Sequence, residues 1–241
     1  MNSQKICFIM CSNDEFQARE AQIYIEQLLV PENYEVEVIV IVGAKSMTSG
    51  YNEAMNASDA KYKIYMHQDV LILRPDFLGA MLELFQKYPE IGMFGMVGNE
   101  SVAEDGGMWS DGAWRRTGEI LVDGIFESDY SLFSKVEGDY AEVIALDGLL
   151  MVTQYDLPWR EDLFGGWDYY DVSQSVEFWK AGYKVVVPRM EAPWCIHEND
   201  VLDMSSYAKW RDIFMKEYWA YVTQWMQEHP MKSRRPEECG D

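Results

Sequence analysis

The chain has 241 residues and a net charge of −21, from 20 lysines and arginines against 41 aspartates and glutamates. A molecule this acidic repels nucleic-acid phosphates and anionic lipid headgroups, so both are poor partners, and its length favours a single domain of the larger α/β kind. The sequence lacks the run of about 18 apolar residues that a transmembrane helix needs, and its opening lacks the layout of a signal peptide. We therefore expect a cytoplasmic protein without a transmembrane segment, in agreement with cysteines 7, 11, 195 and 239, whose spacing matches neither a disulfide framework nor a zinc site.

Strands and helices alternate through the first 97 residues. Apolar runs predict strands over residues 5–11, 35–42 and 62–66, and helical spacing predicts helices over residues 15–30, 46–56 and 75–88. A further apolar run covers residues 91–97. This alternation indicates a parallel sheet covered on both faces, in which binding sites form beyond the carboxyl ends of the strands.

The pattern changes in the second half of the chain. Residues 100–141 are rich in glycine, aspartate and aromatic residues, and they predict an insertion of loops and short antiparallel strands where an acceptor could bind. A strand over residues 143–153, a helix over 172–181 and a strand over 183–188 follow. The amphipathic helix predicted over residues 205–228 carries an aromatic stripe that we expect to be core. Residues 1–229 are thus predicted to form one domain, and residues 230–241 a disordered polar tail.

Polar residues interrupt the apolar elements at four places, which are residues 12–15, 67–69, 165–171 and 195–200. A carboxylate at a strand end costs several kcal/mol if it is buried without compensation, so it is normally solvated, hydrogen-bonded or bound to a cation. Asp69 and His197 offer oxygen and nitrogen ligands for a divalent metal. The alternative is that Asp69 caps the next turn and His197 satisfies a backbone group.

Four stretches, in this order, resemble GT-A-fold glycosyltransferases of the family 2 type, and especially a glycosyltransferase-like subfamily with "HQD" at the third strand end. "ICFIMCSNDE" is similar to their first strand and nucleotide-binding turn, and "SGYNEAMNASDAKYKIYMHQDV" to their "ARN" helix and the strand that ends in Asp-x-Asp. "ALDGLLMVT" resembles the strand that lines the acceptor site. "GGWDYYDVSQSVEFWKAGYKV" is similar to their acidic motif at a helix start.

The resemblance implies a Rossmann-like GT-A fold with a mostly parallel sheet flanked by helices and a C-terminal amphipathic helix. It also implies an inverting glycosyltransferase that moves a sugar from a nucleotide donor, foremost a UDP-sugar, to a hydroxyl of a glycan, lipid-linked saccharide or glycoprotein precursor. A divalent metal, Mn²⁺ or Mg²⁺, would be held by Asp69 and His197. The implied donor-binding residues are Ser12, Asp14, Glu15, Asn52, His67, Gln68 and Asp69.

For catalysis the acidic motif at the helix start points to Asp171 as the base, with Asp168 in reserve. The acceptor-binding residues are expected to be Asp147 and Gly148, in the strand that resembles the acceptor site, and Trp167. Each has an ordinary structural alternative. Asp171 could be a helix N-cap or first-turn acid, and Asp147 a capped turn. Trp109, Trp114 and Trp167 could stack on sugars or belong to the core. We expect Glu198 and Asp200 to be solvated loop acids.

The sequence departs from the family pattern at three positions. His67 replaces the first acid of Asp-x-Asp, and Ser173 replaces a second acid that often follows the catalytic one by two residues. Gly43 replaces an aspartate that pairs with the base of the nucleotide, so the identity of the nucleotide is left open. A non-catalytic carbohydrate-binding or scaffold protein on the same fold is therefore the alternative function. A sugar-1-phosphate nucleotidyltransferase is disfavoured, because "CSNDEFQ" is not the glycine-rich, basic turn that a triphosphate requires.

Overall fold

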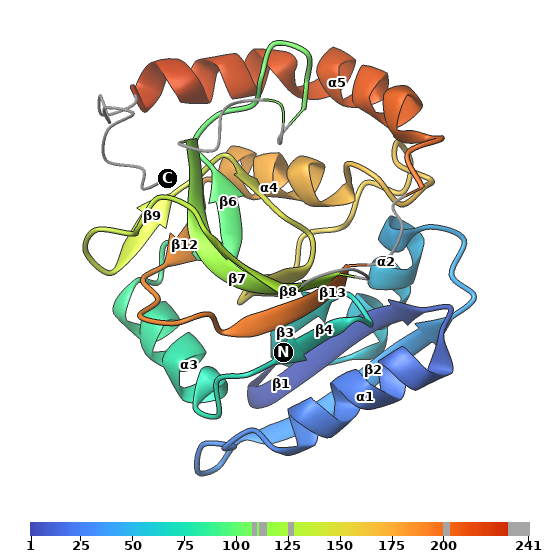
Figure 1. The fold of residues 1–241 in the computed structure, drawn as a ribbon, viewed down its shortest axis with the longest axis vertical. Coiled ribbons are helices and arrows are strands. Elements are labelled where there is room, and N and C mark those ends of the chain that lie inside the picture. Colours follow the sequence, from blue (N-terminus) through green and yellow to red (C-terminus); the bar gives the residue numbers. More distant parts are fainter. Residues whose placement is uncertain (108–109, 111–114, 125–127, 200–202, 231–241) are drawn as a thin grey trace.

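The computed structural model describes residues 1–107, 110, 115–124, 128–199 and 203–230. This part of the chain contains two β-sheets and five helices (Figure 1). The helices are α1 (Glu15–Glu26), α2 (Met47–Ala57), α3 (Phe77–Lys87), α4 (Tyr170–Lys180) and α5 (Tyr207–Glu228).

The first sheet has seven strands in the order β2-β1-β3-β11-β5-β12-β9. In that order they are Glu35–Val42, Asn2–Ser12, Ala60–Met66, Leu150–Thr153, Ile91–Gly95, Lys184–Pro188 and Tyr140–Glu142. Three neighbouring pairs are parallel and three are antiparallel, because β11 runs against both β3 and β5, and β9 against β12. The predicted α/β class is confirmed, with a mixed sheet rather than a mostly parallel one.

The second sheet follows the order β10-β6-β7-β13-β4, and β8 pairs with β7. In that order its strands are Ala145–Leu146, Val97–Asn99, Arg116–Gly124, Cys195–Asn199 and Val70–Ile72, and β8 is Ser128–Leu132. The predicted insertion is thus partly built into the second sheet, since β7 pairs antiparallel with β6 and β8 but parallel with β13. Residues 195–199 form a strand, so the expectation of a loop at Glu198 was wrong.

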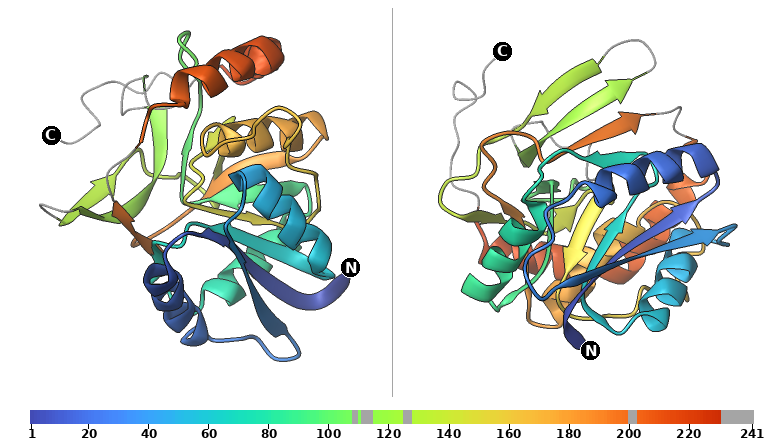
Figure 2. Two further views of the ribbon diagram at one scale, coloured as in Figure 1. Left: turned by 90° about the vertical axis from the view of Figure 1, so that its right-hand side faces the viewer. Right: turned by 90° about the horizontal axis from the view of Figure 1, so that it is seen from below.

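Helices cover both faces of the first sheet (Figure 2). Successive side chains of a strand point to opposite faces, and β1 is buried on both. Its residues Ile6, Phe8 and Met10 pack in the cluster with α1 and α3, whereas Cys7, Ile9 and Cys11 pack in the cluster with α2 and α4. This two-sided burial explains why β1 and β3 are nearly continuous apolar runs in the sequence.

Two of the places where the chain passes from one sheet to the other are adjacent corners. The first corner is the turn of residues 67–69, which joins β3 of the first sheet to β4 of the second. The second corner, residues 147–149, joins β10 of the second sheet to β11 of the first. The backbone N–H of His67 donates to the carbonyl of Leu149 over 3.0 Å, so the two corners are in contact. Polar residues interrupt these apolar runs because each run is two strands in two different sheets.

The C-terminal helix α5 packs on α4 and forms a third core cluster with it (Figure 1). The predicted aromatic stripe is core, as expected: Trp210, Phe214, Tyr218, Val222 and Trp225 are buried, although Tyr221 is 38% exposed. None of the helices in the described residues combines the length and hydrophobicity needed to cross a lipid bilayer. All but the first residue of the predicted tail, residues 231–241, lies outside the described residues.

Candidate active site

A pocket of about 330 Å³ opens at the carboxyl ends of β1 and β3. Its size lies at the lower end of the range for small-molecule sites. It is lined by Cys11, Ser12, Asn13, Met47, His67, Gln68, Asp69 and Trp167. Four of the predicted donor-binding residues are therefore together, and Trp167, predicted to contact the acceptor, lies on the same pocket with 51% of its surface exposed.

The Gln68 side chain ties the two strand ends to each other. Its amide oxygen accepts the backbone N–H groups of Asn13 and Asp14, both over 3.0 Å, and its amide nitrogen donates to the Asn13 side chain over 2.6 Å. The Ser12 hydroxyl donates to the carbonyl of Asp14 within the same loop. Gln68 therefore shapes the pocket floor by bonding the turn after β1 to the turn after β3.

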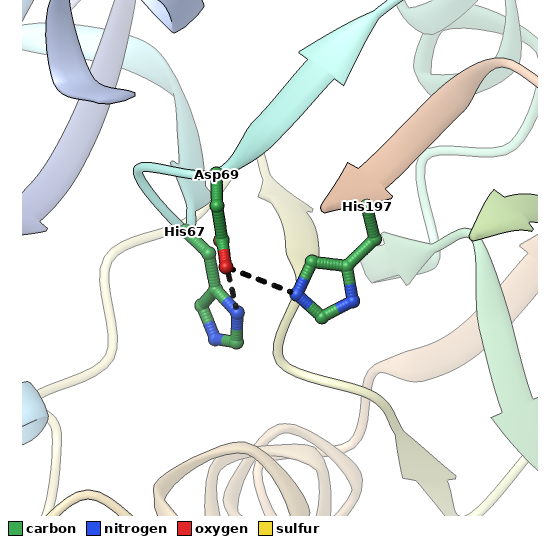
Figure 3. A group of neighbouring side chains, drawn as sticks. All are labelled: His67, Asp69 and His197. Atoms are coloured by element: carbon green, nitrogen blue, oxygen red, sulfur yellow. Dashed lines mark ion pairs between the residues drawn. The ribbon is translucent and has the colours of Figure 1, made fainter. Parts of the chain in front are cut away.

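His67, Asp69 and His197 form a cluster beside this pocket (Figure 3). Asp69 lies between the two rings, with one carboxylate oxygen 3.9 Å from Nδ1 of His67 and the other 3.6 Å from Nε2 of His197. One ligand atom from each residue lies within 4.8 Å of the others. Strand β13 brings His197 here by pairing with β4, and the N–H of Glu198 donates to the carbonyl of Asp69.

Charge and burial act against each other in this cluster. Burial would raise the pKa of Asp69, but the interaction with His197 and the positive charges of both histidines outweigh it, so the pKa is lowered. Burial likewise would lower the pKa of His197, yet Asp69 raises it above the ordinary value. The pKa of His67 is lowered by burial and by His197. The lowered pKa values favour an ionised Asp69 and a neutral His67, the forms that bind metals, whereas the raised pKa of His197 favours a protonated ring that must lose its proton when a cation binds.

The donor set fits a divalent cation that accepts both nitrogen and oxygen ligands. Imidazole nitrogen suits transition metals and carboxylate oxygen suits Mn²⁺ and Mg²⁺, so the mixed set favours a transition metal such as Mn²⁺ over Mg²⁺, which takes oxygen ligands. His67, which replaces the first acid of the family motif, lies inside this cluster. The replacement therefore exchanges an oxygen ligand for a nitrogen ligand, and the position still offers a ligand atom to a cation.

Asp171, in the first turn of α4, bonds to the second chain corner. One of its carboxylate oxygens accepts the backbone N–H of Gly148 over 3.0 Å, and the other accepts that of Val172 over 2.8 Å. Burial and the negative charge of Asp147 raise the pKa of Asp171 to about 7. A carboxylate that titrates near neutral pH is suited to accept a proton.

Asp147 accepts the backbone N–H of Leu149 over 3.0 Å, so it caps its turn as the structural alternative expected. Its charge also contributes to the raised pKa of His197 and Asp171, and it opposes the lowering of the pKa of His67. Asp147 therefore lies close to both the histidine cluster and Asp171. Its negative charge therefore affects the pKa values of the histidines and of Asp171 alike.

Tyr170 is a site residue that the sequence analysis missed. Its hydroxyl is hydrogen-bonded to Nε2 of His67, although its ring belongs to the core. The only signal in the sequence is its position directly before Asp171. An aromatic residue at a helix start gives no indication of which group its hydroxyl will reach.

Two other predicted donor-binding residues, Asp14 and Asn52, have structural partners. Asp14 caps α1, where its side chain accepts the N–H groups of Phe16 and Gln17. The buried Asn52 amide makes two hydrogen bonds with the backbone of Trp159. Asn52 therefore stands apart from the pocket lining.

Asp168, the reserve base, accepts the hydroxyl hydrogen of Ser206 over 2.7 Å, just before α5 begins. Glu15 is exposed in the first turn of α1. Trp109, Trp114 and Asp200 lie outside the described residues.

Comparison with known families matches the model of a glycosyltransferase-like family to residues 7–218. The chain belongs to this family. A search among curated proteins gave no match. The resemblance inferred from the sequence motifs is thereby confirmed at the level of the family, while the "HQD" subfamily remains a prediction.

Solved structures confirm the GT-A-type fold. S. aureus TarS is similar with a TM-score of 0.57 and 11% identity, over 93% of this chain and 42% of the TarS chain. TarS 1–349 in complex with UDP-GlcNAc gives a TM-score of 0.55 at 8% identity, over 95% of this chain and 68% of that one. The mannosyltransferase PcManGT from Pyrobaculum calidifontis, in complex with GDP-Man and Mn²⁺, gives 0.51 at 12% identity, over 98% and 67%. The chain spans less than half the length of the first of these TarS chains.

Proposed function

We propose that the protein transfers a sugar from a nucleotide-sugar donor, foremost a UDP-sugar, to a hydroxyl group of a glycan, lipid-linked saccharide or glycoprotein precursor. One observation carries the proposal: a cluster suited to a divalent cation includes two residues of the first corner, and the second corner, which contacts the first, is bonded to the Asp171 carboxylate with its pKa of about 7. A sugar-nucleotide reaction needs positive charge at the leaving diphosphate and a base at the acceptor. The family and the complexes of TarS and PcManGT with sugar nucleotides support the same assignment.

Binding the donor in this protein requires a source of positive charge. Among the described residues, those that line the pocket include no lysine or arginine, and the molecule carries a net charge of −21. The N–H groups of Asn13 and Asp14 are already bonded to Gln68, so in this arrangement they do not meet a phosphate. His67, Asp69 and His197 would hold a divalent cation, and that ion would stabilise the negative charge of the diphosphate.

Asp171 is the proposed base. The acceptor oxygen forms a bond to the anomeric carbon, the bond from that carbon to the diphosphate oxygen breaks, and its electron pair leaves with the nucleoside diphosphate. The acceptor proton passes to a carboxylate oxygen of Asp171. Each oxygen of Asp171 accepts one backbone N–H and retains a further lone pair, so the carboxylate is held in place and can still accept the proton. Attack from the face opposite the diphosphate gives inversion.

The same geometry favours a transferase over a non-catalytic carbohydrate-binding protein. Loss of the first acid was the reason to consider a decayed site. His67 occupies that position in the cation cluster, with its ring held by Tyr170. A protein that only binds glycans has no need for this cluster beside a carboxylate whose pKa is near 7.

The proposal is tested with a panel of nucleotide sugars, by thermal stabilisation and by release of nucleoside diphosphate, with and without Mn²⁺. We expect one class of donor to raise the melting temperature only with Mn²⁺, and the effect to be lost in Asp69→Ala. Asp76→Ala is the matched control, because Asp76 is an exposed acid paired with Arg74. Glycan binding that is indifferent to nucleotide, metal and Asp69 would instead establish the non-catalytic alternative.

A further inference from the structure

Tyr170 is a buried residue whose one polar side-chain atom points into the proposed site. Its side chain is 4% exposed, and its ring lies in the core against Tyr51 and Trp159, with centroids 5.9 Å and 6.2 Å away. The hydroxyl is hydrogen-bonded to Nε2 of His67. Because neighbouring rings enclose the phenol, its oxygen has a fixed position from which to orient the imidazole.

Gly148 leaves the space that this contact requires. A Cβ atom at position 148 would lie 2.0 Å from the Tyr170 hydroxyl oxygen and 2.5 Å from the ring carbon that bears it. Every other residue type would therefore push Tyr170 away from His67. The N–H of the same glycine donates to Asp171, so one backbone position serves both side chains.

The contact determines which nitrogen of His67 can meet a cation. Nε2 is bonded to Tyr170, whereas Nδ1 faces Asp69. When a cation takes the lone pair of Nδ1, the ring hydrogen is on Nε2 and donates to the Tyr170 oxygen. When the hydrogen is on Nδ1, the Tyr170 hydroxyl donates to Nε2 instead. A phenol can do both, so it holds the ring in one orientation in either state.

We infer that Tyr170 is a positioning residue, which holds the His67 ring with Nδ1 toward Asp69 and accepts the Nε2 hydrogen when a divalent cation binds. The part about the cation rests on the proposed function, whereas the ring orientation does not. Partners of this kind usually set the tautomer and basicity of a metal-binding imidazole. Since Tyr170 directly precedes Asp171, the same turn of α4 supplies the support for the cation cluster and the base.

The first test measures the ring itself, without metal, by ¹⁵N NMR of histidine-labelled protein. The chain has only three histidines, and His67→Ala assigns the signal. We expect Tyr170→Phe to move the two nitrogen shifts of His67 toward those of a freely exchanging imidazole. Tyr65→Phe is the matched control, because Tyr65 is buried in the same aromatic cluster but its hydroxyl faces Trp159. Shifts that stay unchanged in Tyr170→Phe would overturn the inference.

The second test measures the affinity for Mn²⁺ alone, by the electron paramagnetic resonance signal of the free ion. We expect Tyr170→Phe to weaken binding about 10- to 100-fold, as such partners usually do. If Tyr170 acts through His67, the double variant with His67→Ala should bind Mn²⁺ no more weakly than His67→Ala alone. Losses that add, or an unchanged affinity in Tyr170→Phe, contradict the role. If the unmodified protein binds no Mn²⁺, the proposed metal use fails, while the NMR result still decides the ring orientation.

Discussion

The starts of helices α1 and α4 both carry an aspartate, yet the two residues do different things. Asp14 is exposed and caps α1 by accepting N–H groups from its own helix. Asp171 is partly buried in the first turn of α4 and accepts one N–H from that turn and another from Gly148, 23 residues away in the sequence. Burial and the charge of Asp147 raise the pKa of Asp171 to about 7.

The difference comes from what packs against each helix start. At α4 the corner of residues 147–149 covers Asp171 and brings the charge of Asp147 close to it. At α1 the side chain faces solvent. An acid at a helix start is favoured by the helix dipole in either case, so the chemistry depends on the segment across from it.

The largest effect is expected at Asp171. Asp171→Asn removes the proton acceptor while it keeps the shape and one of the two backbone hydrogen bonds, so transfer should fall by about 10²- to 10⁴-fold with donor affinity retained. Asp76→Asn is the matched control, because Asp76 is an exposed acid at the start of α3 that is paired with Arg74. Initial rates and donor titrations on both variants measure this. Equal rates for Asp171→Asn and the unmodified protein would move the base to Asp168 or away from both.

The raised pKa of Asp171 should also make stability depend on pH. Between about pH 4 and 7 the folded chain holds this proton and the unfolded chain has released it, so the stability from Asp171 is full at low pH and is lost as pH rises through 7. The loss amounts to about 1.4 kcal/mol per pH unit at its steepest. Urea unfolding from pH 5 to 8 should show Asp171→Asn gaining stability relative to the unmodified protein. If the stabilities of the two proteins changed with pH in parallel, the raised pKa of Asp171 would be contradicted.

The same titration predicts the pH dependence of activity. A base with a pKa near 7 is protonated in acid, so kcat/KM should rise with pH through about 7 and then level. A rate profile measured with a good donor checks this. A profile that is flat between pH 5.5 and 8.5 would contradict the role of Asp171.

A smaller effect is expected at two glycines, Gly148, which packs against the start of α4, and Gly182, which follows its end. Gly148→Ala places a methyl group against Tyr170 and should cost about 1 to 3 kcal/mol, together with most of the activity. Gly182→Ala, just after α4, has open space but a positive φ of +87°, so it should cost about 1 kcal/mol and leave the rate unchanged. Chemical denaturation measures the loss of stability in each variant, and initial rates measure the loss of activity. Equal activity in both variants would show that Tyr170 and Asp171 tolerate displacement.

The smallest effect is expected for Asp14→Ala. Loss of the cap should lower the free energy of unfolding by about 1 kcal/mol. Because Asp14→Asn retains the cap, a comparison of donor affinity in the two variants separates capping from ligand contact. A loss of affinity in both variants would support the predicted contact of Asp14 with the donor, and full affinity in both would assign Asp14 to capping alone.

Much of the fold can be read from the sequence because local patterns determine it. β2 begins and ends at the predicted residues 35 and 42, and the helices lie within about four residues of their predicted bounds. The predictions were less complete where pairing is distant. Residues 91–97 and 143–153 each read as one strand but contribute strands to two sheets. Periodicity reports burial, and both halves of each run are buried, so the change of sheet leaves no polar residue in 91–97 and only Asp147-Gly148 as a trace in 143–153.

The site could be predicted to the extent that it lies at strand ends. Polar residues after β3 indicated His67, Gln68 and Asp69, and the family motif indicated Asp171. Tyr170 and the turn that Gln68 holds together depend on contacts across 103 and 55 residues. Asn52 was placed with the donor from its motif, but its amide bonds to a backbone that the motif does not include.

Helix α5 has a consequence for any shortened form of this protein. It contributes no residue to the pocket lining, yet it buries one side of α4, and Ser206 at its start holds Asp168, two residues before Tyr170. A fragment that stops before residue 206 would keep every proposed ligand and the base, but would leave Val172 and Val176 on the outer side of α4 uncovered by this helix. We expect such a fragment to be inactive because α4 is no longer held in place, although every proposed catalytic and ligand residue is still present.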